Sequence, residues 1–275
     1  MSTDYTVELK GEALDLYLKL RYPPNPKPRE AYPHLSDKPQ PWPPQPAATT
    51  PQRKRPSKPV LYKRLTLKLA KEITGHITGL GKPSKMPGFS TATSAEACIT
   101  GRKLAKVPGS PCADCYALKG NYQYPSVQLG HKRRLAALAN PLWVEGMARL
   151  IGHYTDPQDP YFRIHDSGDF QSVEHVLMWV DVAEALPWVE FWVPTQERLF
   201  LSRARIRLGR TWPSNLVVRV SSTKVGQAQT KGPWPTSSVD SGVGHGCPAP
   251  KQGGKCGSCR ACWDPKVSNV DYHKH

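Results

Sequence analysis

The most restrictive feature of this sequence is a regular alternation of strand-like and helix-like segments between residues 161 and 220. Three short runs rich in β-branched and aromatic residues (161–165, 189–193 and 216–220) predict buried strands. The segments between them (172–186 and 198–208) repeat apolar residues at helical spacing. Helices between consecutive strands imply right-handed crossovers and a parallel sheet. With a first short strand expected at 89–93, we predict an α/β fold built as a full or partial (β/α) barrel.

Prolines and cysteines mark the two ends of the chain as different from its middle. Thirteen of the 29 prolines lie between Pro23 and Pro59, which is typical of an extended, polyproline-like linker without a core. We therefore expect three parts. These are an N-terminal extension with a basic linker (1–59), a barrel-like domain (60–240) and a cysteine-rich, metal-binding segment packed on the barrel (241–275).

The formal net charge of the chain is +16, which is large for 275 residues. Such a charge attracts phosphates and predicts nucleic acid or a nucleotide as the partner. A solvated basic tail would also explain the charge, so that interpretation stays open. No run of about 18 apolar residues is present, and the N-terminus lacks an apolar signal region. We therefore expect a soluble, cytoplasmic protein that binds no membrane.

The seven cysteines fall into two groups, and the first is Cys98, Cys112 and Cys115. An odd number of clustered cysteines in a reducing compartment indicates metal ligation rather than disulfides. Three thiolates leave one coordination position open, as a catalytic metal or an iron–sulfur cluster requires. A structural zinc site would need a fourth ligand, for which His131 is the nearest candidate. Both interpretations remain open.

The second group lies within sixteen residues near the C-terminus and predicts a second metal site. Its members are Cys247, Cys256, Cys259 and Cys262. Four thiolates complete a site without outside help, either as a closed zinc knuckle or as an iron–sulfur centre.

Polar residues follow each predicted strand, at the end where barrel enzymes carry their chemistry. The candidate catalytic residues are His165, Asp166, Asp169 and Lys224. The candidate cofactor-binding residues are Ser167, Gly168, Asp169, Thr195, Ser221, Arg163 and Arg219. The two arginines lie inside strands, where an unpaired charge is costly. We expect them to face a carboxylate, a phosphate or a polar ligand, although a purely structural ion pair of Arg163 stays open.

Three segments of the chain (112–122, 162–170 and 247–256) resemble the phage gene product 88 family, and the resemblance extends over about residues 75–275. It implies a phage-encoded protein that acts in the cytoplasm of the infected host cell.

The layout also resembles that of radical S-adenosylmethionine enzymes. Those enzymes hold a [4Fe–4S] cluster with three cysteines after the first barrel strand, and bind the amino group of the cofactor with a Gly-Gly-Glu-like motif after the second. In this chain, Cys98, Cys112 and Cys115 correspond to the cluster-binding cysteines, and Ser167-Gly168-Asp169 corresponds to the Gly-Gly-Glu-like motif. The first two cysteines are separated by thirteen residues here, rather than by three. The resemblance implies a [4Fe–4S] cluster, S-adenosylmethionine and an electron-donor protein. It further implies an auxiliary cluster or zinc at the C-terminal cysteines, and nucleic acid or a nucleotide as substrate.

Two other functions remain open. The segment 166–171 is similar to the Asp-Ser-Gly-Gly-Phe-Gln segment of tRNA-guanine transglycosylases. That similarity implies a base-modifying enzyme with structural zinc, in which an aspartate acts as nucleophile or base-binder. The third interpretation is a non-catalytic, zinc-stapled nucleic-acid-binding protein.

Overall fold

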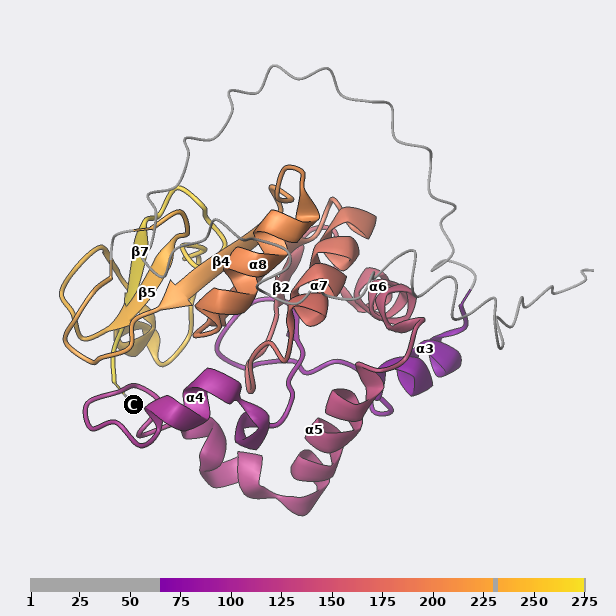
Figure 1. Cartoon of the computed structure of the whole chain (residues 1–275), viewed down its shortest axis with the longest axis horizontal. Helices are drawn as coiled ribbons and strands as arrows, with labels where there is room; N and C mark the ends of the chain where they lie inside the picture. The colour runs from indigo at the N-terminus through magenta and orange to yellow at the C-terminus, as the bar shows by residue number, and fades with distance from the viewer. Residues whose placement is uncertain (1–64, 230–231, 275) are drawn as a thin grey trace, which may run out of the picture. The chain divides into compact units, whose positions relative to one another are not determined.

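The computed structural model describes residues 65–229 and 232–274. The predicted N-terminal extension and proline-rich linker (1–59) therefore lie outside the described residues. Figure 1 shows the arrangement of the helices and strands discussed below.

The described residues form one seven-stranded sheet in which every strand is parallel to its neighbours, in the order β1-β2-β3-β4-β5-β7-β6. The strands are β1 (Phe89–Ser90), β2 (Tyr161–Arg163), β3 (Glu190–Thr195), β4 (Leu216–Ser221), β5 (Thr236–Val239), β6 (His245–Gly246) and β7 (Asn269–Tyr272). The predicted α/β class with a parallel sheet is confirmed.

The predicted full barrel is not formed, because the sheet is open at β1 and β6. Closure would require the outer edge of β1 to pair with another strand. That edge is instead capped by Gly81, whose N–H donates to the Ser90 carbonyl (2.9 Å) and whose carbonyl accepts from the Ser90 N–H (2.8 Å). A capped, two-residue edge strand offers no further hydrogen-bonding groups to a closing partner.

Six α-helices are described, and their boundaries follow local signals in the sequence. They are α3 (Leu67–Thr74), α4 (Ile99–Leu104), α5 (Pro125–Ala137), α6 (Trp143–Tyr154), α7 (Val173–Ala185) and α8 (Arg198–Leu208). Ser172 caps α7 by accepting from the His175 N–H (3.1 Å), and Pro125 opens α5 at a position where no N–H is needed. Helices α7 and α8 are the predicted crossovers between β2, β3 and β4. No helix among the described residues is long and apolar enough to span a bilayer.

The two faces of the sheet are covered by different parts of the chain. Phe162 and Phe191 pack on Trp179 of α7, and α6, α7 and α8 lie side by side in Figure 1. Trp192 alternates with Phe191 along β3 and packs on Trp263 of the C-terminal segment, with 5.3 Å between ring centres. The cysteine-rich segment therefore packs on the face opposite the helices.

Candidate functional site

The first group of cysteines lies in the long connection that follows β1. Cys98 directly precedes α4, and Cys115 directly precedes a short 3-10 turn (Tyr116–Leu118). A Cβ atom added at Gly101 would lie 3.7 Å from the Sγ atoms of both Cys98 and Cys112. The two sulfurs therefore face the same side of α4, although thirteen residues separate them in the sequence.

Acidic groups surround these thiols. Burial, followed by nearby Asp169 and the thiols of Cys115 and Cys112, raises the pKa of Cys98 well above its ordinary value. Burial and the neighbouring Cys115 likewise raise the pKa of Cys112 to about 11. The electrostatic interactions thus connect all three cysteines and Asp169. A metal cation at this position would offset the clustering of negative charge and favour the thiolate forms.

The three thiols are neighbours rather than a formed coordination shell. Within residues 65–229 and 232–274, no group of three His, Cys, Asp or Glu side chains has the geometry needed to bind a metal ion. The donor set is nonetheless the one that iron–sulfur clusters use. Gly101 keeps the space beside the Cys98 and Cys112 sulfurs free of a side chain.

Asp169 connects the ends of β2 and β3. Its Oδ1 accepts from the Thr195 hydroxyl (2.6 Å) and the Phe170 N–H (2.8 Å), and its Oδ2 accepts from the Gln196 N–H (2.8 Å). Burial raises the pKa of Asp169 to about 7 despite these hydrogen bonds. Two of the candidate residues, Asp169 and Thr195, are thus joined by a hydrogen bond, and Asp169 lies close enough to Cys98 to act on its thiol.

Glu197 and Gln196 belong to this site, and the sequence analysis did not single them out. The Glu197 carboxylate accepts from the Thr100 N–H (2.7 Å) and hydroxyl (2.8 Å), which ties the end of β3 to the first turn of α4 beside Cys98. Gln196 donates from Nε2 to the Ser222 carbonyl (3.0 Å), and its buried Oε1 has no partner among the described residues. Their only signal was their position directly after a predicted strand.

Ser167 and Gly168 hold the turn after β2 against the segment that follows β1. The Ser167 hydroxyl donates to the Thr93 carbonyl (3.0 Å), and the Thr93 N–H donates to the Ser167 carbonyl (2.9 Å). Gly168 has a φ of 83°, and a Cβ added there would lie 2.1 Å from the Thr93 hydroxyl oxygen. The Ser-Gly-Asp turn thus requires glycine at its centre, and Ser167 acts as a backbone anchor.

Arg163 also supports the cysteine loop. It donates to the Tyr116 hydroxyl (3.0 Å), which in turn donates to the Asp166 carbonyl, and its guanidinium lies 4.9 Å from the centre of the Trp192 ring. Tyr116 directly follows Cys115. The strand arginine therefore fixes the Cys-x-x-Cys turn to the end of β2.

His165 and Arg219 do not lie where the sequence analysis placed them. His165 has a φ of 59°, and its buried ring contacts Phe170 and His175 with neither nitrogen hydrogen-bonded in the described structure. Burial, followed by His175, lowers the pKa of His165 well below its ordinary value. It is a neutral core residue rather than an acid or base at the strand ends.

Arg219 is buried on the face covered by the C-terminal segment. It donates five hydrogen bonds to main-chain carbonyls, namely those of Ala261, Cys262, Asp264, Val267 and Thr236. Its donors are committed to holding the cysteine-rich segment, so it is not available to a cofactor.

The remaining predicted residues are Ser221, the last residue of β4, and Lys224, in the loop that follows it. The Ser221 hydroxyl hydrogen-bonds with that of Ser237 (3.2 Å). Lys224 is exposed, and its neighbour Val225 donates from its N–H to the Gly109 carbonyl of the cysteine loop (2.8 Å). The structure therefore places Lys224 at the rim of the candidate site.

The four C-terminal cysteines also influence one another. Burial and the nearby thiol of Cys247 raise the pKa of Cys256, and burial raises the pKa of Cys262 to about 11. The Cys259 Sγ lies 3.4 Å from the Nε2 of His245, which the sequence analysis did not select. The Cys262 Sγ lies 3.1 Å from the Tyr272 hydroxyl.

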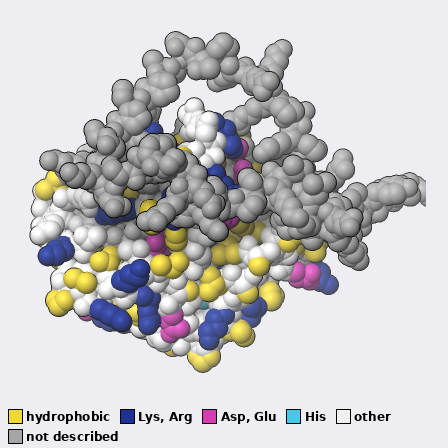
Figure 2. Space-filling model, viewed as in Figure 1, with side chains coloured by type: hydrophobic (Ala, Val, Ile, Leu, Met, Phe, Trp, Pro, Cys, Tyr) yellow, Lys and Arg dark blue, Asp and Glu magenta, His cyan; other side chains and the backbone are white. Residues whose placement is uncertain are grey.

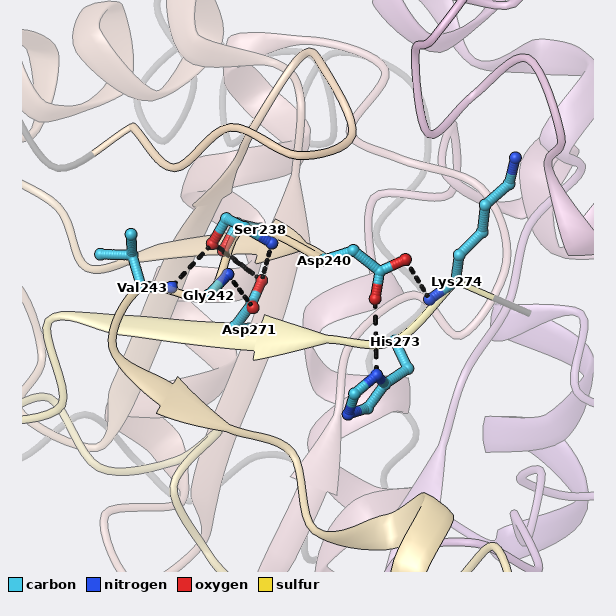
Figure 3. Close-up of polar contacts among 8 residues, drawn as sticks. Ser238, Asp240, Gly242, Val243, Asp271, His273 and Lys274 are labelled. Carbon is cyan, nitrogen blue, oxygen red and sulfur yellow. Dashed lines mark hydrogen bonds and ion pairs between the residues drawn. The ribbon is translucent and has the colours of Figure 1, made fainter.

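Strand β7 connects the C-terminal segment with the first cysteine group. Figure 3 shows Asp271 accepting from Ser238 and from the main chain of Gly242, and Asp240 contacting His273 and the Lys274 N–H. The Lys274 Nζ lies 3.1 Å from Asp114, inside the Cys112–Cys115 motif.

Comparison with known proteins gives one match. The model of the family described as gene product 88 matches residues 60–265. A search of curated proteins found no match, and neither did a search of solved structures. The match extends from before β1 to just beyond the last of the seven cysteines, and so includes both cysteine groups and the ends of β2, β3 and β4. This chain is a member of the phage gene product 88 family.

Proposed function

We propose that this protein is an iron–sulfur enzyme of the radical S-adenosylmethionine type that modifies nucleic acid or a nucleotide. One observation carries the proposal. The Cys98 and Cys112 sulfurs face the same side of α4 in the connection after the first strand of a parallel sheet, and Cys115 and Asp169 lie close enough to act on the Cys98 thiol. Cys98, Cys112 and Cys115 would hold a [4Fe–4S] cluster. An open or partial barrel with helices on one face would support this layout as well as a closed one.

A cluster bound by three cysteines supplies an open iron for a cofactor and a redox centre for radical chemistry. The side chains of this site suit the amino group of such a cofactor. Gln196 Oε1 is a buried acceptor that no donor among the described residues reaches, and an unpaired buried acceptor is costly. The Asp169 carboxylate, joined to the Gln196 main chain, adds negative charge at the same place. We assign these two groups to the cofactor amine, with Ser167 and Thr195 positioning Asp169.

The charge distribution supports a nucleic acid or nucleotide substrate. Residues 65–275 contain 26 Lys and Arg against 16 Asp and Glu, so the excess positive charge is not confined to the N-terminal part. Arg102, Lys103 and Lys106 are exposed in and after α4, next to the cysteines. Figure 2 shows Lys and Arg side chains distributed over one face of the described residues, among apolar and a few acidic ones. Such a surface attracts the phosphate backbone.

The C-terminal cysteines would hold an auxiliary centre, either a second iron–sulfur cluster or zinc, with His245 as an additional neighbour. An electron-donor protein would be a required partner of a radical enzyme. Arg219 fixes the main chain at Ala261 and Cys262 and so preorganises that site.

Metal analysis of anaerobically purified protein tests the proposal. We expect a brown protein that loses about four irons when Cys98, Cys112 or Cys115 is replaced by serine, because each supplies one cluster ligand. Cys262→Ser is the matched control, and it should leave that iron in place. A colourless protein that binds about one zinc would contradict the proposal and favour the transglycosylase-like or the DNA-binding interpretation.

A further inference from the structure

A cavity of about 390 Å³ with both apolar and polar lining residues opens beside the cysteine loop, on the outer side of β1. Pockets for small organic ligands have volumes of about 300–1,000 Å³. The residues that matter for its chemistry come from five separate segments, and they are His76, Ser90, Tyr122, His131, Arg134 and Asp166. Asp166 links this cavity to the cysteines, because its carbonyl accepts from the hydroxyl of Tyr116, the residue after Cys115.

Asp166 and Arg134 leave hydrogen-bonding groups unused at this cavity. The Asp166 Oδ2 accepts from the Ser90 hydroxyl (3.2 Å), whereas its Oδ1 is buried and has no partner among the described residues. Arg134 donates from Nε to the Ala92 carbonyl (2.5 Å), and its terminal nitrogens make no further hydrogen bond within the described part of the chain. The cavity thus offers one buried acceptor and a set of donors to a ligand.

The two histidines of the cavity are uncharged at neutral pH. Burial, followed by Arg134, lowers the pKa of His76 to about 3 and that of His131 to about 4. His76 uses both ring nitrogens on Thr74 and Thr91 and is part of the wall. The His131 ring lies 6.0 Å from the Tyr122 ring, centre to centre, so the two rings lie near each other at the cavity wall.

These features select a class of ligand. Two guanidiniums, those of Arg163 and Arg134, lie close enough to Asp166 to act on its carboxyl, so a simple cation is not favoured here. A phosphate carries no N–H donor for the unpaired Asp166 Oδ1. A neutral molecule with an N–H donor next to an acceptor satisfies both groups at once. The Tyr122 and His131 rings at the wall suit a flat heterocycle.

We propose that this cavity binds one nucleobase, with a base N–H donated to Asp166 Oδ1 and an adjacent base acceptor receiving a hydrogen bond from Arg134. The inference rests on the proposed function for the substrate class and adds the place where the base is held. Enzymes that modify a base commonly extrude it from the nucleic acid into such a pocket. The exposed basic residues of α4 would then hold the flanking phosphates.

Titration calorimetry with the full-length protein and each of the four common ribonucleosides tests the inference. We expect one nucleoside to bind, and Asp166→Asn to weaken that binding by at least about tenfold, because the amide can present an N–H where the base donor needs an acceptor. Val127→Phe fills the cavity from α5 without changing its polar groups and should weaken binding similarly. Glu72→Gln removes an exposed carboxylate on α3 and should change nothing.

Two results would overturn the inference. One is that no nucleoside binds the wild-type protein at about 1 mM. The other is that both Asp166→Asn and Val127→Phe, with melting temperatures like that of the wild type, keep the wild-type affinity. Val127→Phe decides the matter alone if Asp166→Asn fails to fold. A protein that binds a nucleoside but takes up no iron would refute the proposed function alone. An iron-loaded protein without nucleoside binding would refute this inference alone.

Discussion

Asp169 is the residue on which the geometry of the site depends most. Its two oxygens accept three hydrogen bonds from residues after β2 and β3, yet burial raises its pKa to about 7. The carboxyl group is therefore held at a position where ionisation costs free energy. Such a position is expected where a positively charged group is to be bound.

A pH series on metal-free protein should reveal this cost. Because the folded pKa of Asp169 is raised from 3.8 to about 7, the folded state binds more protons than the unfolded state between these values. The free energy of unfolding should therefore fall by up to about 4 kcal/mol as the pH rises from about 4 past 7, because the folded protein must then ionise a buried carboxyl group. Asp169→Asn should lack this dependence in urea unfolding experiments. Parallel pH profiles for the two proteins would contradict the assignment.

Gly168 should tolerate no side chain. At Gly168→Ala we expect a loss of about 2–4 kcal/mol in the free energy of unfolding, because strain at positive φ adds to the contact with Thr93. Gly226→Ala is the matched control, since Gly226 also has a positive φ (75°) but has nothing within 4 Å of the added Cβ. It should cost only about 1 kcal/mol. Equal losses in both variants would argue against the packing of Gly168 on Thr93.

At the scale of elements, the end of β3 positions α4 and hence Cys98. Glu197 bonds both the N–H and the hydroxyl of Thr100, so the helix and the strand move together. Thr100 lies two residues after Cys98, so this connection holds the Cys98 end of α4 at the end of β3.

Replacing Glu197 tests that connection. Glu197→Gln should lower the iron bound after reconstitution and destabilise the protein by about 1–3 kcal/mol, since a buried pair of hydrogen bonds is disturbed. The exposed Glu96, in the same connection, is the control, and Glu96→Gln should bind iron like the wild type. Unchanged iron content in both variants would show that Glu197 does not position the cysteines.

The elements differ in how well the sequence predicts them. Helix α8 was expected at 198–208 and spans Arg198–Leu208, because its position follows from local apolar spacing and short turns. The openness of the sheet depends instead on Gly81 pairing with Ser90, a contact that no local pattern reveals. Asp169 and Thr195, in contrast, can be selected from the sequence because they lie at the ends of predicted strands. The buried positions of His165 and Arg219 depend on which segment covers each face.

At the scale of the whole molecule, three exposed basic residues (Arg102, Lys103 and Lys106) lie in the cysteine loop, and the C-terminal segment also reaches it. Lys274, at the end of β7, reaches Asp114 in the Cys-x-x-Cys motif, so the C-terminal segment and the first cysteine group belong to one structural unit.

The surface charge should govern nucleic-acid affinity. Replacing Arg102, Lys103 and Lys106 by glutamine should reduce the slope of log affinity against log salt by about 2 for a single strand, because about 0.7 counterions are released per phosphate contact. The same replacement of Lys251, Lys255 and Lys266, which are exposed in the C-terminal segment, is the control. Fluorescence anisotropy with a labelled oligonucleotide measures both slopes. A larger effect of the control set would place the contact elsewhere.

The most direct test of the central claim is electron paramagnetic resonance of the reduced protein with and without S-adenosylmethionine. Three cysteines that leave one iron open predict a [4Fe–4S] signal that changes when the cofactor is added and disappears in Cys98→Ser. A signal that the cofactor leaves unchanged, or a protein that binds no iron under anaerobic conditions, would contradict the claim that these three thiols form an open cluster site.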